Sequence, residues 1–132
     1  MPSKTLLFEF KADTATFRVA DTEPPLEEVS VVGSGRFKGK NLTTLYTIRI
    51  SPTKTSKDRH EGAGILYLEG GGRSTYRMKG TLISTPKWRE VVTGTMALGD
   101  DANGDLRELK NLTVSYKTLV DANGKSSTKV WK

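Results

Sequence analysis

Four aromatic side chains with polar tips and one carboxylate carry most of the chemistry that this sequence offers in an interior. Each falls on the apolar face of a stretch in which apolar and polar residues alternate: Tyr46, Tyr76, Trp88, Glu90 and Tyr116. Buried Tyr and Trp usually need hydrogen-bond partners, and a buried carboxylate must be paired or have its pKa raised. A barrel with a polar and aromatic pocket meets these needs, and so does a place near the rims with the polar tips in water. These five residues are the candidate ligand-binding set.

Other chemistries find little support in the residue types. The chain has no cysteine, which excludes thiol nucleophiles and thiolate zinc sites. His60 is the only histidine and follows a polar stretch, so we expect it to be solvated. A calcium-like acidic series lacks the glycine and glutamate that complete a calcium loop, so we expect a turn at Asp101, Asn103 and Asp105. The sequence predicts no metal and no cofactor.

The elements that position the candidate residues are strands, and a glycine-rich hairpin is central among them. Residues 61–83 form two β-rich arms around Gly70, Gly71 and Gly72, and glycine supplies the positive φ of a tight reversal. With these glycines as the loop, Glu69 faces Arg73. One face of the hairpin then carries Leu66, Leu68, Tyr76, Met78 and Leu82. A two- or four-residue loop would invert every side chain and place Ala63, Ile65 and Tyr67 inside.

Alternation predicts the remaining strands. Residues 6–19 change phase near Asp13 and Thr14, which predicts a bulge or bend there. The two prolines in Asp21 to Glu28 predict a loop. Further strands are expected over 29–37, 42–50, 88–98, 112–120 and 125–131, with a polar, mobile connection over 51–59. Leu106 to Leu109 is expected to close into one helical turn.

About eight short strands joined by hairpin-length loops form one all-β domain over residues 1–132. The first architecture is a single antiparallel up-and-down β-barrel, because closure hides the edges of the sheet. The alternative is a two-sheet β-sandwich. Glycines inside strands favour the barrel, since they let a strongly curled sheet bend: Gly33, Gly35, Gly62, Gly64, Gly80 and Gly94.

The formal charge of +6 and the pI near 9.6 favour an anionic partner, nucleic acid first among them. The cations are scattered along predicted strands, however, so we expect weak nucleic-acid binding at most. Aromatic residues beside cations occur only as fragments, at Tyr67 and Trp131. No apolar run reaches the length of a signal peptide or a membrane span, and we expect a cytoplasmic protein without membrane contact.

Two segments resemble a known group of proteins. His60-Glu61-Gly62-Ala63-Gly64-Ile65-Leu66 with the glycine turn that follows, and the closing Ser127-Thr128-Lys129-Val130-Trp131, resemble small, functionally uncharacterised β-barrel proteins. That group is similar to the barrels of allene oxide cyclase and dirigent proteins. The match covers about a third of the chain, and His60 stands where the group has a glycine. The resemblance implies a barrel with a ligand in its lumen, and it transfers no catalytic residue.

Three functional hypotheses follow. The first is binding of a small aromatic or lipophilic molecule in the lumen of the barrel by the candidate set. The second is binding of single-stranded nucleic acid on a basic outer surface. The third is a cofactor-free cyclase or isomerase in which Glu90 or Glu61 acts as acid or base. Binding and catalysis differ only by turnover, which no feature of the sequence decides.

Overall fold

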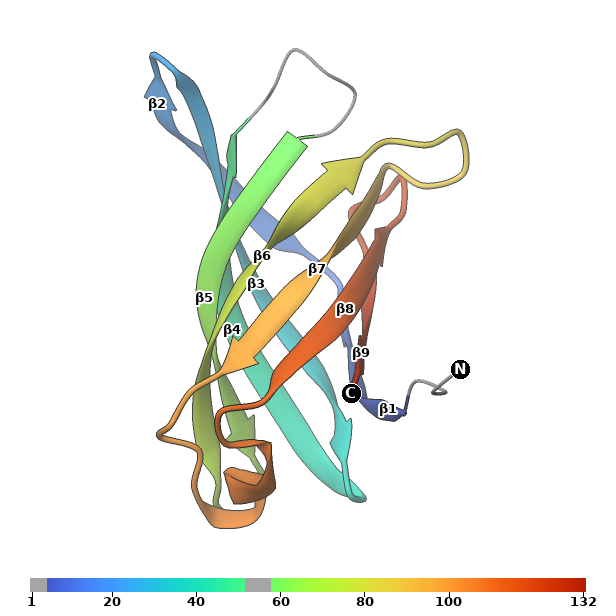
Figure 1. The fold of residues 1–132 in the computed structure, drawn as a ribbon. Coiled ribbons are helices and arrows are strands. Elements are labelled where there is room, and N and C mark those ends of the chain that lie inside the picture. Colours follow the sequence, from blue (N-terminus) through green and yellow to red (C-terminus); the bar gives the residue numbers. More distant parts are fainter. Residues whose placement is uncertain (1–4, 52–57) are drawn as a thin grey trace.

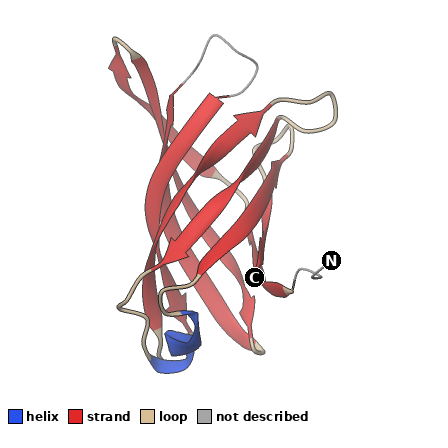
Figure 2. Ribbon diagram, viewed as in Figure 1, coloured by secondary structure: helices blue, strands red, loops and turns tan. Residues whose placement is uncertain are grey.

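The computed structural model describes residues 5–51 and 58–132, and these form one antiparallel β-barrel (Figure 1). Strands dominate, and a single short 3-10 helix, η1 (Gly104–Leu109), lies at one end within this described part (Figure 2). The strands are β1 (Leu6–Ala12), β2 (Ala15–Thr22), β3 (Pro25–Phe37), β4 (Lys40–Ser51), β5 (Asp58–Leu68), β6 (Arg73–Ile83), β7 (Glu90–Leu98), β8 (Thr113–Val120) and β9 (Ser126–Trp131). The predicted all-β barrel is confirmed.

Closure comes from the first strand. Strands β3 to β9 pair in chain order, and β1 pairs with β9 on one side and with β3 on the other. Eight strands therefore make a closed ring, and β2 is an additional strand that pairs with β3. The hairpin of β2 and β3 projects beyond the ring (Figure 1). The closed ring leaves no room for the alternative of two separate sheets.

The phase change in the first 19 residues is a shift of register. Glu9 pairs with Arg36 in β3, whereas Ala15 pairs with Val31, so one extra residue separates the two registers. The break falls at 13–14, as the alternation predicts. The loop expected over 21–28 is wrong, because β2 continues to Thr22 and β3 resumes at Pro25. Proline is acceptable as the first residue of a strand, since its missing N–H leaves the ladder beyond it intact. Of the expected connection over 51–59, residues 52–57 lie outside the described residues.

The central hairpin has the predicted faces but a different register. Tyr67, and not Glu69, faces Arg73, and the backbone N–H of Leu68 donates to the carbonyl of Gly72. The register differs from the expected one by two residues, which preserves the inward face. The inward residues are buried as expected: Leu66, Leu68, Tyr76, Met78 and Leu82. Glu69 instead accepts a hydrogen bond from the side-chain amide of Asn41, at 3.0 Å.

One end of the barrel is closed by η1. Leu106 and Leu109 are fully buried and join the hydrophobic core, and Asn103 and Asp101 bind the start of β6 through hydrogen bonds to Arg73 and Thr75. The acidic series thus serves turns, as predicted. We call this closed end the lower end. The opposite, upper end carries the β6–β7 and β8–β9 connections and the projecting β2–β3 hairpin (Figure 1).

Candidate ligand site at the upper end of the barrel

The upper part of the lumen holds a cavity of about 50 Å³. Its lining is mostly apolar, with a few polar side chains, and comes from the eight strands β2 to β9 and the β8–β9 turn: Ala15, Phe17, Val29, Val31, Tyr46, Ile48, Ile50, His60, Met78, Glu90, Val92, Tyr116, Thr118, Val120, Gly124 and Ser126. We call this space the upper cavity. One water needs about 10–15 Å³ by the same measure, so the cavity admits a few waters or a slim part of a ligand.

A buried histidine and tyrosine meet in the upper cavity. His60 is 3% exposed and its Nε2 is hydrogen-bonded to the hydroxyl of Tyr116, which is 2% exposed. Burial lowers the pKa of His60 to about 4 and raises the pKa of Tyr116, so both groups are neutral near pH 7. The expectation that His60 would be solvated is wrong. We call these two residues the His60–Tyr116 pair.

Two glycines let this pair form. On neighbouring strands of the barrel wall, from β5 to β8, His60 pairs with Gly80, Gly80 with Gly94, and Gly94 with Tyr116. The two side chains therefore approach each other over two positions that have no side chain. A Cβ on Gly94 would lie 2.9 Å from the hydroxyl oxygen of Tyr116. At both positions glycine allows a close approach, of the backbone of β7 at Gly80 and of the Tyr116 hydroxyl at Gly94.

One atom of the pair has no partner. Nδ1 of His60 is buried and makes no hydrogen bond within the described part of the chain. When Nε2 accepts from Tyr116, Nδ1 carries an unused N–H, and when Nε2 donates, Nδ1 is an unused acceptor. In either tautomer one polar atom of the pair is left without a hydrogen bond among the described residues.

Glu90 brings a carboxylate to the same cavity from the first residue of β7. The side chain is half-buried, and burial is the main cause that raises its pKa. The negative charges of Glu27 and Asp58 raise the pKa further, and Arg89 opposes them. Glu61, the other carboxylate considered for acid or base chemistry, is exposed on the outer face and does not line the upper cavity.

The other two candidate tyrosines, Tyr46 and Tyr76, lie in different surroundings. Tyr46 lines the upper cavity, with its ring centroid 6.3 Å from that of Phe10, and burial raises its pKa to about 12. Tyr76 is fully buried and bonded to Thr44 at 2.6 Å. Because the Thr44 hydroxyl donates to the carbonyl of Ile65, Tyr76 must donate to Thr44. The hydroxyl of Tyr76 therefore has its hydrogen-bond partner inside the barrel. Tyr76 is not among the residues that line the upper cavity.

Trp88 belongs to the β6–β7 connection, although the alternation predicts it within a strand. Its backbone N–H donates to Oγ1 of Thr85, and its carbonyl accepts from the backbone N–H of Thr85. The turn that starts before Pro86 thus extends to Trp88, and β7 begins at Glu90. Three of the five candidate residues, Tyr46, Glu90 and Tyr116, meet in the upper cavity, and His60 joins them.

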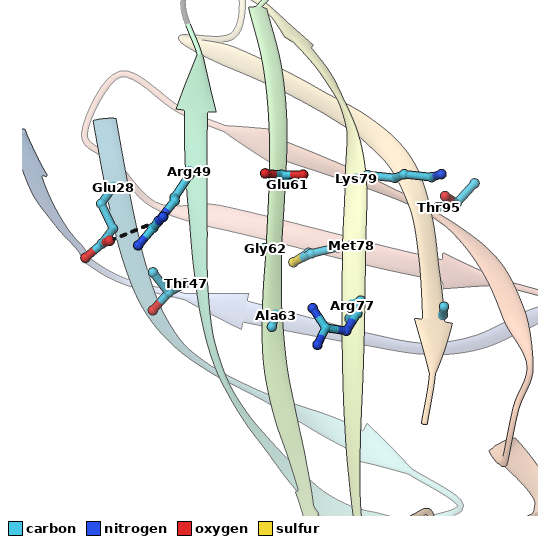
Figure 3. A pocket seen from close by; sticks show the side chains of 11 residues that line it. Glu28, Thr47, Arg49, Glu61, Gly62, Ala63, Arg77, Met78, Lys79 and Thr95 are labelled. Atoms are coloured by element: carbon cyan, nitrogen blue, oxygen red, sulfur yellow. Dashed lines mark ion pairs between the residues drawn. The ribbon is translucent and has the colours of Figure 1, made fainter. Parts of the chain in front are cut away.

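The outer wall also carries a hollow, of about 650 Å³, across β3 to β7 (Figure 3). Charged side chains of both signs alternate across it: Glu28, Arg49, Glu61 and Lys79. Nε of Arg49 lies 3.4 Å from Oε2 of Glu28. A groove that follows a nucleic-acid backbone is positively charged, and this hollow is mixed in charge.

Within residues 5–51 and 58–132, no group of three or more His, Asp or Glu side chains is arranged to hold a metal ion. Among the same residues no helix has the length and apolar character of a membrane span. Comparison of the chain with protein-family models, with curated proteins and with solved structures finds no significant match.

Proposed function

We propose that the protein binds a small aromatic or lipophilic molecule in the upper cavity, with a slim part of the ligand inside the lumen. Support comes from the lining, which is mostly apolar with a few polar groups, as in typical ligand sites. The lower end is closed by Leu106 and Leu109 of η1, so a ligand enters from the upper end.

The observation that carries the proposal is the unpaired Nδ1 of His60. Other buried polar side chains of the described interior are paired: Thr118 bonds Thr128 at 2.7 Å, and Ser74 bonds the carbonyl of Thr75 at 3.0 Å. A buried polar atom without a partner costs about 1–3 kcal/mol. A ligand group that pairs with Nδ1 removes this cost, and the gain adds to the free energy of binding.

A thermal-shift screen against small aromatic and lipophilic compounds tests the proposal with two matched variants. Ser126 lines the upper cavity, whereas Ser127 follows it on the other face of β9 and does not. Ser126→Leu places a large side chain in the cavity, and Ser127→Leu makes the same change outside it. We expect compounds that raise the melting temperature of the wild type to raise that of Ser127→Leu equally. The rise in melting temperature that these compounds cause in Ser126→Leu should be less than half of the rise in the wild type.

Two results of the screen count against the proposal. One is that no compound stabilises the wild type. The other is that compounds stabilise the wild type and both variants alike, which would place binding elsewhere on the barrel.

A cofactor-free cyclase or isomerase stays a prediction, for which Glu90 is the better placed acid or base. Nucleic-acid binding on the outer surface also stays a prediction.

A further inference from the structure

Apolar side chains stand next to one another on the outer wall of the barrel. Val32 pairs with Leu45, and Leu45 with Ile65, so the three form one row across β3, β4 and β5. Val32 is 63% exposed and Leu45 is 41% exposed, and Tyr67 follows Ile65 on the outer face of β5. Single exposed apolar side chains are common, whereas a contiguous group marks an interaction surface. We call Val32, Leu45 and Ile65 the apolar row.

A row of charges crosses the same wall four residues nearer the upper end. Its members pair side by side on β3, β4, β5 and β6, and their signs alternate (Figure 3): Glu28, Arg49, Glu61 and Lys79. We call these four residues the charged row. Arg49 forms an ion pair with Glu28, but Glu61 and Lys79 are exposed and belong to no ion pair within residues 5–51 and 58–132. Both charges are therefore available to a partner.

The order of the signs indicates which partner fits. A partner of one sign would be attracted by two members of the charged row and repelled by the other two. A second copy of this chain matches all four when a two-fold axis runs parallel to the strands, between β4 and β5. That rotation reverses the order of the row, so Arg49 faces Glu61 of the second copy, and Glu28 faces its Lys79. A two-fold axis along the row would instead place each charge opposite itself.

The rest of the wall agrees with the axis between β4 and β5. The rotation places Leu45 against Ile65 of the second copy, so the two apolar rows cover each other. The other cations on the outer face of this part of β6 would each face a serine of β3 in the second copy: Arg77 opposite Ser30, and Arg73 opposite Ser34. No like charges meet in these four rows.

From this match we propose that the outer wall of β3 to β6 is the interface of a homodimer, in which the charged row and the apolar row of each protomer face those of its partner. The same patch serves both protomers, so each contact occurs twice. The inference goes beyond the proposed function and does not depend on it, because the upper cavity lies in the lumen and the interface lies on the wall.

Sedimentation equilibrium of the full chain at low ionic strength tests the proposal. We expect the average mass of the wild type to rise from that of a monomer toward that of a dimer as the protein concentration increases. Because exposed charge pairs are screened by ions, salt should weaken the association. A wild type that stays monomeric up to its solubility limit would contradict the proposal.

Two charge reversals test the charged row. Arg49→Glu sets the introduced glutamate against Glu61 of the partner, and Glu61→Arg sets the introduced arginine against Arg49 of the partner. Opposed like charges are unfavourable and each contact occurs twice, so we expect either variant alone to dimerise about tenfold more weakly or worse. Unchanged association of both variants would place the interface elsewhere.

Mixing the two variants separates a broken interface from a broken fold. In a mixed dimer the introduced glutamate faces the introduced arginine, and the remaining Glu61 faces the remaining Arg49. We expect the mixture to dimerise about as tightly as the wild type, although neither variant does so alone. Variants that are folded by circular dichroism but stay monomeric when mixed would overturn the proposed axis.

A second matched pair of variants tests the apolar row. Leu45→Ser removes an apolar side chain from the proposed interface, and Val19→Ser removes one from β2, where Val19 is 69% exposed outside the interface. We expect Leu45→Ser to weaken the dimer and Val19→Ser to leave it unchanged. Equal association of the wild type and Leu45→Ser would contradict the proposal.

Discussion

Gly80→Ala is expected to destabilise the protein by about 3 kcal/mol or more, a large part of the stability of a domain of this size. A Cβ at this position would lie 2.0 Å from the carbonyl oxygen of Thr93 and 2.6 Å from Cα of Gly94. Both are backbone atoms of the neighbouring strand, so no side chain can rotate away. Strands β6 and β7 would have to separate beneath the His60–Tyr116 pair. Unfolding in guanidinium chloride measures the change.

Gly71→Ala is the matched control for this prediction. Gly71 lies in the loop of the central hairpin at φ +109°, and a Cβ there would meet nothing within 4 Å. Its cost is the conformational strain of a positive φ alone, about 1–2 kcal/mol. If Gly80→Ala is no more destabilising than Gly71→Ala, the close approach of β6 and β7 at Gly80 is not as described.

The second large effect is a loss of stability in acid that depends on His60. Burial holds the pKa of His60 at about 4, against 6.5 for an exposed histidine. Between these two values the unfolded chain binds a proton that the folded chain does not. This stabilises the unfolded state, so stability is complete above pH 6.5 and falls as the pH decreases toward 4. From pH 7.5 to pH 5 the expected loss is about 2 kcal/mol.

His60→Gln isolates this contribution, because glutamine can still hydrogen-bond to Tyr116 but does not titrate. The other carboxyl groups with shifted pKa values change the stability either in another pH range or in the opposite direction. The raised pKa of Glu90 favours the folded state as the pH falls, and the lowered pKa values of Asp101 and Asp105 matter mainly below pH 4. The stability of the wild type should therefore decline more steeply than that of the variant from pH 7 to pH 5. Parallel pH profiles would show that His60 does not titrate as a buried group.

The sequence predicts the faces of the strands well because a period of two is visible in each strand by itself. The buried positions of β4 and β8 are those of the alternation, and so is the shift at Asp13 and Thr14. Register is harder to predict. A two-residue slip at Gly70 to Gly72 keeps the same residues inside, so alternation cannot distinguish Tyr67 from Glu69 as the partner of Arg73.

The candidate site was predictable in part. Alternation places Tyr46, Glu90 and Tyr116 on inward faces, whereas a lone histidine directly after a polar stretch is expected in solvent. The signal was present, since His60 has the same parity as Leu66 and is therefore on the inward face of β5. Its partner lies 56 residues away and is reached across Gly80 and Gly94, a contact that only the pairing of four strands creates.

The central claim is that the lumen, and not the outer wall, holds the ligand. Intermolecular NOEs between a compound that stabilises the wild type and assigned methyl groups test it most directly. Ile48 and Val92 line the upper cavity, whereas Val32 and Leu45 are exposed on the outer face. We predict NOEs from the ligand to Ile48 and Val92 and none to Val32 or Leu45. NOEs to Val32 and Leu45 without any to Ile48 or Val92 would contradict the account.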